Sequence, residues 1–153
     1  MCPQAYATVI GVNVAAVPFE TLTGAEVYHI CRLRQQVFVL EQACLYPDLD
    51  GRDLEPGTLH VLMTTDARLV GYARVLDDET TWRIGRVLLA PSARGRGWAD
   101  RLITTALAAV SGRDVVLDAQ SPLAGWYATF GFVVDGPEFI EDGIPHMPMR
   151  LRV

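Results

Sequence analysis

Two glycines and three arginines lie close together in the segment PSARGRGWADRL, residues 91–102. The segment follows the apolar run IGRVLLA and precedes a stretch whose apolar spacing predicts a helix. The first amides of a helix have no partner within the helix and lie at the positive end of its dipole. Because Gly95 and Gly97 would let an anion approach the main chain, and arginines add positive charge, the segment suits a phosphate or pyrophosphate. A solvated turn without a ligand is the alternative.

Two common nucleotide-binding motifs do not fit this segment. A P-loop ends in Gly-Lys-Ser/Thr, and the chain has no lysine, because all 13 basic residues are arginine. The dinucleotide motif G-x-G-x-x-G fails at its last position, where Asp100 replaces the third glycine. An acid at that position would repel a nearby pyrophosphate if it faced inward. Neither nucleotide fold is therefore expected.

The composition of the 153-residue chain predicts one globular domain with a sizeable core. A net charge of −5 argues against general nucleic-acid binding, which normally uses a basic face. The cysteines, Cys2, Cys31 and Cys44, lack metal-type spacing and indicate a reducing compartment. No uncharged apolar run reaches the ~20 residues of a membrane helix, and no basic segment opens a signal peptide. We expect a cytoplasmic protein with a tail at 1–10 and one domain at 11–153.

Strands are expected where apolar residues alternate or run together between turn-forming residues. These runs are 12–19, 58–65, 69–77, 81–90, 114–120, 131–134 and 146–153. Short polar turns join the second, third and fourth runs and force antiparallel neighbours, so this part of the sheet is a meander. The acidic segment 41–57 is expected to be a loop with one short helix.

Three helices are expected beside these strands. The first begins at a capping box, TGAE at 23–26, and carries Arg34 on or beside its buried stripe. The second occupies 98–110 and buries one face. The third occupies 123–130, with Ser121 as its cap. The phosphate-type turn thus lies between a strand and the second helix.

The turn resembles the R/Q-x-x-G-x-G/A signature of the GCN5-related N-acetyltransferases (GNAT). Arg94, Gly97 and Ala99 meet this signature. Upstream, VLLAP resembles the family's fourth strand, and downstream WYATFGF (126–132) is similar to the Y-x-x-x-G-F of its second cofactor motif. Two such motifs, about 30 residues apart in a strand–helix–strand–helix order, identify the chain as a member of that superfamily.

Three longer segments are similar to the ElaA-like branch of the superfamily. They are LRQQVFVLEQACLYPDLDGRDL, IGRVLLAPSARGRGWADRL and EDGIPH, together about a third of the chain. The resemblance implies a single α/β (α+β) domain. Its mixed sheet would have six or seven strands, flanked by helices, and its fourth and fifth strands would splay apart.

The resemblance also implies how an acyl-CoA donor, most simply acetyl-CoA, would bind. Its pantetheine arm would lie between the splayed strands and pair with the main chain of Val87, Leu88 and Leu89 like an added strand. The pyrophosphate would be held by the turn, whose residues are Arg94, Gly95, Arg96, Gly97, Trp98 and Ala99. No metal is expected.

Direct transfer from a thioester requires an acid for the departing sulfur. Tyr127 occupies the family's tyrosine position, four residues before Gly131. A tyrosine with a pKa of about 10 keeps its proton at neutral pH, so it can donate to a thiolate. Tyr127 is therefore the candidate catalytic acid, with plain packing on a buried helix face as the alternative.

A base must also take a proton from the amine, since an alkylammonium with a pKa of about 10 is mostly protonated at neutral pH. Glu41 is the first candidate, because it follows an apolar helix end where the family's acceptor-side loop begins. His60, Asp118 and His146 are candidate acceptor-binding residues and further candidates for the base. Each of these residues has the ordinary alternative of a solvated or hydrogen-bonded polar group. Together with the acids at 141 and 142 they would suit a cationic amine.

The sequence therefore predicts an N-acetyltransferase that moves acetyl from acetyl-CoA to a small-molecule or peptide amine by direct attack in a ternary complex. A non-catalytic acyl-CoA sensor is one alternative, although a sensor needs no acid for the leaving group. An acyltransferase similar to the acyl-homoserine-lactone synthases is another. The expected partners are the donor and an amine acceptor, without nucleic acid or membrane, in a monomer or homodimer.

Overall fold

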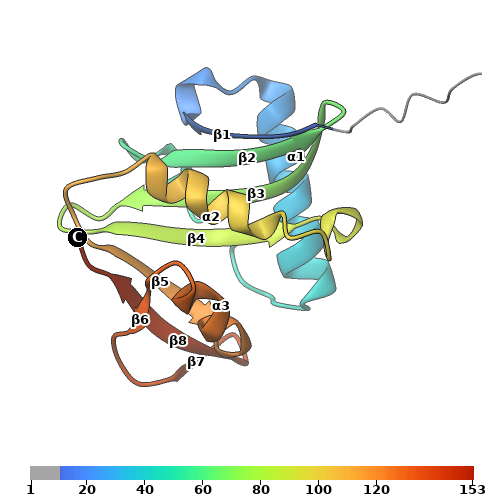
Figure 1. Ribbon diagram of the computed structural model, residues 1–153. Coiled ribbons are helices and arrows are strands. Elements are labelled where there is room, and N and C mark those ends of the chain that lie inside the picture. Colours follow the sequence, from blue (N-terminus) through green and yellow to red (C-terminus); the bar gives the residue numbers. More distant parts are fainter. Residues whose placement is uncertain (1–10) are drawn as a thin grey trace, which may run out of the picture.

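The computed structural model describes residues 11–153, which form one mixed sheet with helices packed against it (Figure 1). The strands are β1 (Val12–Pro18), β2 (Leu59–Thr65), β3 (Arg68–Asp77), β4 (Trp82–Leu89), β5 (Val115–Gln120), β6 (Val133–Val134), β7 (Phe139–Glu141) and β8 (Ile144–Leu151). Their order is β1-β2-β3-β4-β5-β8-β6, and β7 pairs with β8. The expected mixed sheet is confirmed, but it has eight strands instead of six or seven, because β7 pairs with β8 beside the main strand order. The tail expected at 1–10 lies outside the described residues.

The first helix begins at the predicted capping box. The Thr23 hydroxyl accepts from the Glu26 N–H at 3.1 Å, and the Glu26 carboxylate accepts from the Thr23 N–H at 2.7 Å. The helices are α1 (Gly24–Arg34), which continues as a π-helix over Gln35–Glu41, α2 (Ala99–Ala108) and α3 (Ala124–Ala128). Within the described residues, no helix is long and apolar enough to cross a membrane.

The sheet buries both of its faces, because successive side chains of a strand point to opposite sides. On one face, Val61 and Met63 of β2 belong to the cluster that contains Leu102 and Ile103 of α2. On the other, Leu62 packs against the cluster formed around α1. Figure 1 shows α2 across the front of the strands and α1 behind them.

The strands β4 and β5 are neighbours over a short length only. Their parallel register pairs Trp82 with Val115 and Arg83 with Val116, and it extends no further along these two described strands. On its other side β4 contains a bulge, because Arg86 and Val87 lie opposite the single residue Ala73 of β3, and Arg86 has a φ of 53°. The splay expected between the fourth and fifth strands is confirmed.

Two local predictions are wrong. Ser121 does not cap the third helix, since its hydroxyl donates instead to the Glu138 carboxylate at 2.7 Å. The segment between 131–134 and 146–153, for which no strand was expected, contains β7 and a hairpin turn that joins it to β8. Its turn residues, Asp142 and Gly143, have φ values of 50° and 77°, the left-handed conformation that Asp-Gly turns adopt. This hairpin fixes the position of the residues that follow it.

Candidate functional site

A cavity of about 430 Å³ lies beside the diverging strands β4 and β5. Its lining comes from five regions: the end of the helical segment and the following loop, β3, β4 with its bulge, β5, and α3 with the β7–β8 hairpin. Among the lining residues are Gln42, Asp50, Arg74, Arg83, Arg86, Val87, Asp118, Gln120, Tyr127, Glu141, Asp142 and His146. The structure thus brings Val87, Tyr127, Asp118 and His146 to one cavity.

The phosphate-type turn follows the end of β4. Gly95 and Gly97 have φ values of 74° and 71°, a conformation that glycine adopts without the cost that a side chain brings. A Cβ at either position would meet nothing within 4 Å. Among the described residues, the amides of Gly95, Arg96 and Gly97 donate no hydrogen bond. An anion can therefore approach these amides directly, next to the start of α2 at Ala99.

Arg94, the first residue of the signature, is bound to Glu41. The guanidinium donates to both carboxylate oxygens, at 2.6 and 3.0 Å, and its Nε donates to the Leu89 carbonyl at 3.2 Å. The hydrogen bond from Arg94 lowers the pKa of the Glu41 carboxyl, which makes it a weaker base. Glu41 is also not among the residues that line the cavity. The Arg94–Glu41 pair therefore connects the end of the helix that continues α1 to the end of β4.

Tyr127 lies on α3 with its side chain buried, and its ring packs edge-on against Phe132. Burial raises the pKa of Tyr127 to about 12, so the hydroxyl keeps its proton at neutral pH. Within the described residues this hydroxyl has no hydrogen-bond partner, although it belongs to a residue that lines the cavity. The neighbouring Trp126 donates from its indole nitrogen to Asp100 at 2.8 Å and so connects α3 to the first turn of α2.

Asp118 and His146 line the cavity in different ways. The Asp118 carboxylate accepts a bond from Arg83 of β4 at 3.2 Å, across the start of the splay. His146 is held by Ile144, whose carbonyl oxygen lies 2.8 Å from Nδ1, and its ring stacks on Phe139 with 5.6 Å between centroids. One oxygen of Asp118 is thus bound to Arg83, whereas no group among residues 11–153 bonds to the second ring nitrogen of His146.

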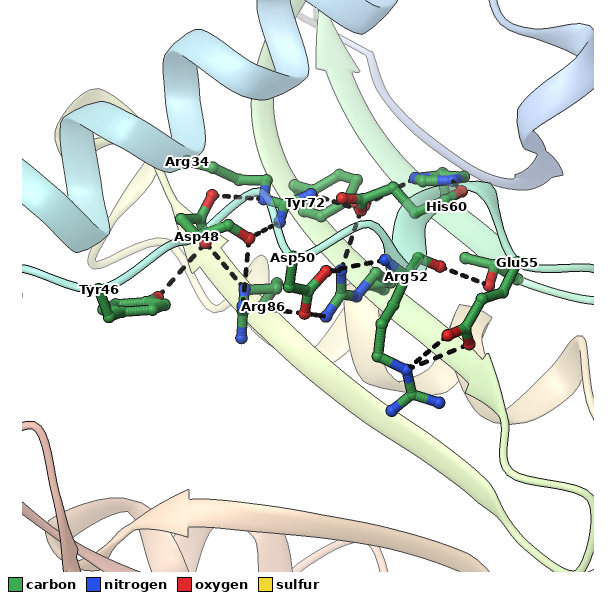
Figure 2. A network of polar contacts seen from close by, with 12 residues as sticks. Arg34, Tyr46, Asp48, Asp50, Arg52, Glu55, His60, Tyr72 and Arg86 are labelled. Atoms are coloured by element: carbon green, nitrogen blue, oxygen red, sulfur yellow. Dashed lines mark hydrogen bonds and ion pairs between the residues drawn. The ribbon is translucent and has the colours of Figure 1, made fainter.

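A buried network of charged residues lies behind the β4 wall of the cavity (Figure 2). Its centre is Arg34 of α1, of which 1% is exposed. The guanidinium binds the Asp48 carboxylate at 2.9 Å and the Asp53 carboxylate at 2.6 Å, and it also donates to the Asp48 carbonyl at 2.7 Å. Two carboxylates and one carbonyl of the loop therefore share a single arginine of the helix.

Two further arginines extend the network to the sheet. Arg74 of β3 donates to both oxygens of Asp50, at 2.8 and 2.9 Å. Arg86, in the bulge of β4, forms an ion pair with Asp48 at 2.8 Å. Asp50, Arg74 and Arg86 also line the cavity. The loop between α1 and β2 is therefore bonded to a helix and two strands at once.

His60 belongs to this network and does not reach the cavity, contrary to its proposed role in acceptor binding. Its Nδ1 lies 2.7 Å from the Tyr72 hydroxyl, and its Nε2 lies 3.1 Å from the Asp53 carbonyl. Burial lowers the pKa of His60 and so keeps the ring neutral. The network was not predicted from the sequence, although an arginine on an apolar stripe followed by an acid-rich loop is a usable signal of it.

Comparisons with known proteins agree with this geometry. Residues 24–153 match the family model described as the acetyltransferase (GNAT) domain. A UPF0039 protein of Mycobacterium tuberculosis is 45% identical over 133 residues, which are 84% of this chain and 85% of that protein. A solved acyl-CoA N-acyltransferase from Pseudomonas aeruginosa has a TM-score of 0.87 at 36% identity, over 92% of this chain and 99% of its own. Escherichia coli ElaA has a TM-score of 0.88 at 33% identity, over 93% and 100%. The chain therefore belongs to the GNAT acyltransferase family, as an ElaA-like member.

Proposed function

We propose that this chain transfers an acetyl group from acetyl-CoA to an amine of a small molecule or peptide, by direct attack in a ternary complex. One observation carries the proposal: β4 and β5 part beside a cavity, and the strand that leads into the gap ends at a turn with exposed amides. Membership of the GNAT family supports an acyl-CoA donor. The acetyl group and the amine acceptor are the specific part of the proposal.

The donor would occupy the gap as an added strand. Among the described residues, no strand pairs with β4 on its β5 side beyond Arg83, so the pantetheine arm could pair there with the main chain of Val87, Leu88 and Leu89. The pyrophosphate would accept bonds from amides between Gly95 and Ala99. Arg96, whose guanidinium lies 5.0 Å from the centre of the Trp98 ring, adds positive charge beside the turn.

The reaction replaces the C–S bond of the thioester by a C–N bond and transfers one proton from the amine to the thiol. The lone pair of the amine nitrogen attacks the thioester carbon, and the C–S bond breaks as the tetrahedral intermediate collapses. The departing sulfur takes the hydroxyl proton of Tyr127, and the amine gives up one proton, so the products are an amide and the free thiol of coenzyme A. The buried hydroxyl of Tyr127 suits this role, because it is protonated and has no competing partner within the described residues.

The donor site is tested by Gly97→Ala. The added methyl group would lie where the structure leaves open space and where the pyrophosphate would approach. We expect the affinity for coenzyme A, measured by calorimetry, to fall at least tenfold, or about 1.4 kcal/mol. Gly112→Ala is the matched control, because Gly112 has a φ of 75° and the same open surroundings away from the turn. An equal affinity for both folded variants would contradict the assignment of the turn.

The chemical step is tested by Tyr127→Phe, which keeps the ring and removes the proton donor. We expect kcat to fall by about 10²-fold, within the range of general acid catalysis, while acetyl-CoA binds as before. Thiol release is measured with spermidine, tobramycin and the dipeptide Ala-Phe as acceptors. Tyr28→Phe, at an exposed tyrosine of α1, is the control.

Three results are informative. Turnover by the wild type with loss in Tyr127→Phe alone supports the proposal. Equal kcat in both proteins would remove Tyr127 from the mechanism. Tight binding of acetyl-CoA without thiol release from any acceptor would instead favour a sensor.

A further inference from the structure

His146 is fixed in place by the strand register on both sides. It lies near the start of β8, opposite Gln120, the last residue of β5, and opposite Phe139 of β7. Both neighbours belong to strands rather than to loops, so the imidazole has little freedom to move along the cavity wall. The side chain is half-buried and lines the same cavity as Tyr127.

The contacts of the ring also fix its tautomer. A carbonyl oxygen can only accept a hydrogen bond, so Nδ1, which lies 2.8 Å from the Ile144 oxygen, must carry the hydrogen. In the neutral ring Nε2 then has a free lone pair. Among residues 11–153 no group bonds to Nε2, and the stacked Phe139 ring, inclined at 21°, restrains the imidazole. These are the requirements for a group that accepts a proton.

The charges around the cavity are unevenly distributed. Arg83 and Arg86 of β4 are each bound to aspartates, including Asp118 of β5 in the case of Arg83. Glu141 and Asp142, in the hairpin that precedes His146, have no ion pair with any residue of the described chain. The side of the cavity that carries His146 therefore presents free negative charge, which would attract an ammonium group.

We propose that Nε2 of His146 is the general base that takes the proton from the acceptor amine, which rests on the N-acyltransferase function proposed above. The acceptor's ammonium gives one proton to Nε2, and the lone pair that this exposes forms the C–N bond. The nitrogen loses its second proton to solvent as the tetrahedral intermediate collapses, and Tyr127 gives its own proton to the sulfur as the C–S bond breaks. The imidazolium then returns its proton to solvent and Tyr127 regains one, so that the ammonium has lost two protons in total, one to the thiol and one to solvent.

Among the candidate bases, His146 combines a place in the cavity with an acceptor atom that no cation of the described residues holds. Glu41 is held by Arg94 and does not line the cavity, and His60 is bonded through both of its ring nitrogens. Asp118 lines the cavity, but one of its carboxylate oxygens is held by the Arg83 guanidinium. The lack of a cationic partner among residues 11–153 therefore distinguishes His146 from Asp118.

The test is His146→Gln, which keeps a polar side chain without a basic nitrogen. We expect kcat/KM for the best alkylamine of the acceptor panel to fall by about 10²-fold or more, while calorimetry shows unchanged binding of coenzyme A. The variant should lose the acidic limb of the wild-type pH–rate profile and rise with pH toward the amine's own pKa of about 10. Methoxyamine, which is largely neutral at pH 7, should show a much smaller loss.

Each alternative outcome has a distinct meaning. His29→Gln, at an exposed histidine of α1, should behave as the wild type. Equal rates for the wild type and His146→Gln would overturn the base assignment while leaving the acyltransferase function intact. Equal losses for the alkylamine and methoxyamine, with an unchanged pH profile, would overturn it in favour of a residue that only positions the acceptor. No thiol release by the wild type with any amine would overturn both proposals.

Discussion

The β4 wall and the β5 wall of the cavity are each held by an arginine–aspartate pair, in very different surroundings. Behind the first, Arg34 and Asp48 lie 2.9 Å apart with 1% and 7% of their side chains exposed. Across the opening to the second, Arg83 and Asp118 lie 3.2 Å apart with 36% and 39% exposed. Since the distances are similar, the surrounding solvent determines what each pair contributes. An exposed pair typically contributes about 1 kcal/mol or less, whereas breaking a buried one costs about 3–5 kcal/mol.

The largest effect is therefore expected for Arg34→Met, which leaves Asp48 and Asp53 buried without their shared partner. The free energy of unfolding in urea should fall by about 3–5 kcal/mol, because Asp48 and Asp53 lose the charge and hydrogen bonds of Arg34 and keep only Arg86 and Arg74, respectively, to offset their desolvation. A reduced urea midpoint with an unchanged slope would show that the native state alone is affected.

A second substitution tests whether this loss of stability comes from the interaction between Arg34 and Asp48. Arg34→Met combined with Asp48→Asn removes one of the carboxylates that lost Arg34, so the double variant should be less destabilised than the sum of the two single variants. Strict additivity would contradict the view that the two residues act as one buried unit.

A much smaller effect is expected for Asp118→Asn. The carboxylate is partly exposed, and Arg83 keeps its second partner, Asp78, at 2.8 Å. The free energy of unfolding should change by about 1 kcal/mol or less, and the difference should shrink as salt screens the pair. A loss as large as that of Arg34→Met would show that exposure does not separate the two walls.

The sequence predicted features that depend on nearby residues. The capping box of Thr23 and Glu26 and the turn around Gly95 and Gly97 could be predicted because their contacts lie within a few residues. The splayed strands were predicted only through the family resemblance, since no local pattern specifies how far β4 and β5 stay paired. The hairpin turn at Asp142 was not predicted, although an Asp-Gly pair is a typical signal of such a turn.

Long-range partners could not be predicted from the same patterns. Glu41 appeared to be a free carboxylate at a helix end, but the fold places it against Arg94, 53 residues away in the chain. In the sequence, His60 lies between apolar residues and has the pattern of an ordinary strand residue. Only the fold shows that both of its ring nitrogens are hydrogen-bonded. The roles of such residues depend on which distant segment of the chain packs against them in the fold.

The short pairing between β4 and β5 links ligand binding to the stability of the C-terminal strands. These strands meet β4 through two register pairs, and the rest of the gap lacks the backbone partners that a continuous sheet would supply. A molecule that occupied the gap along β4 would supply such partners and would bind only the folded form. By mass action, a ligand at 100 times its dissociation constant adds about 2.7 kcal/mol to the free energy of unfolding. Local opening of β5 and β8 would then be coupled to the release of such a ligand, and each would favour the other.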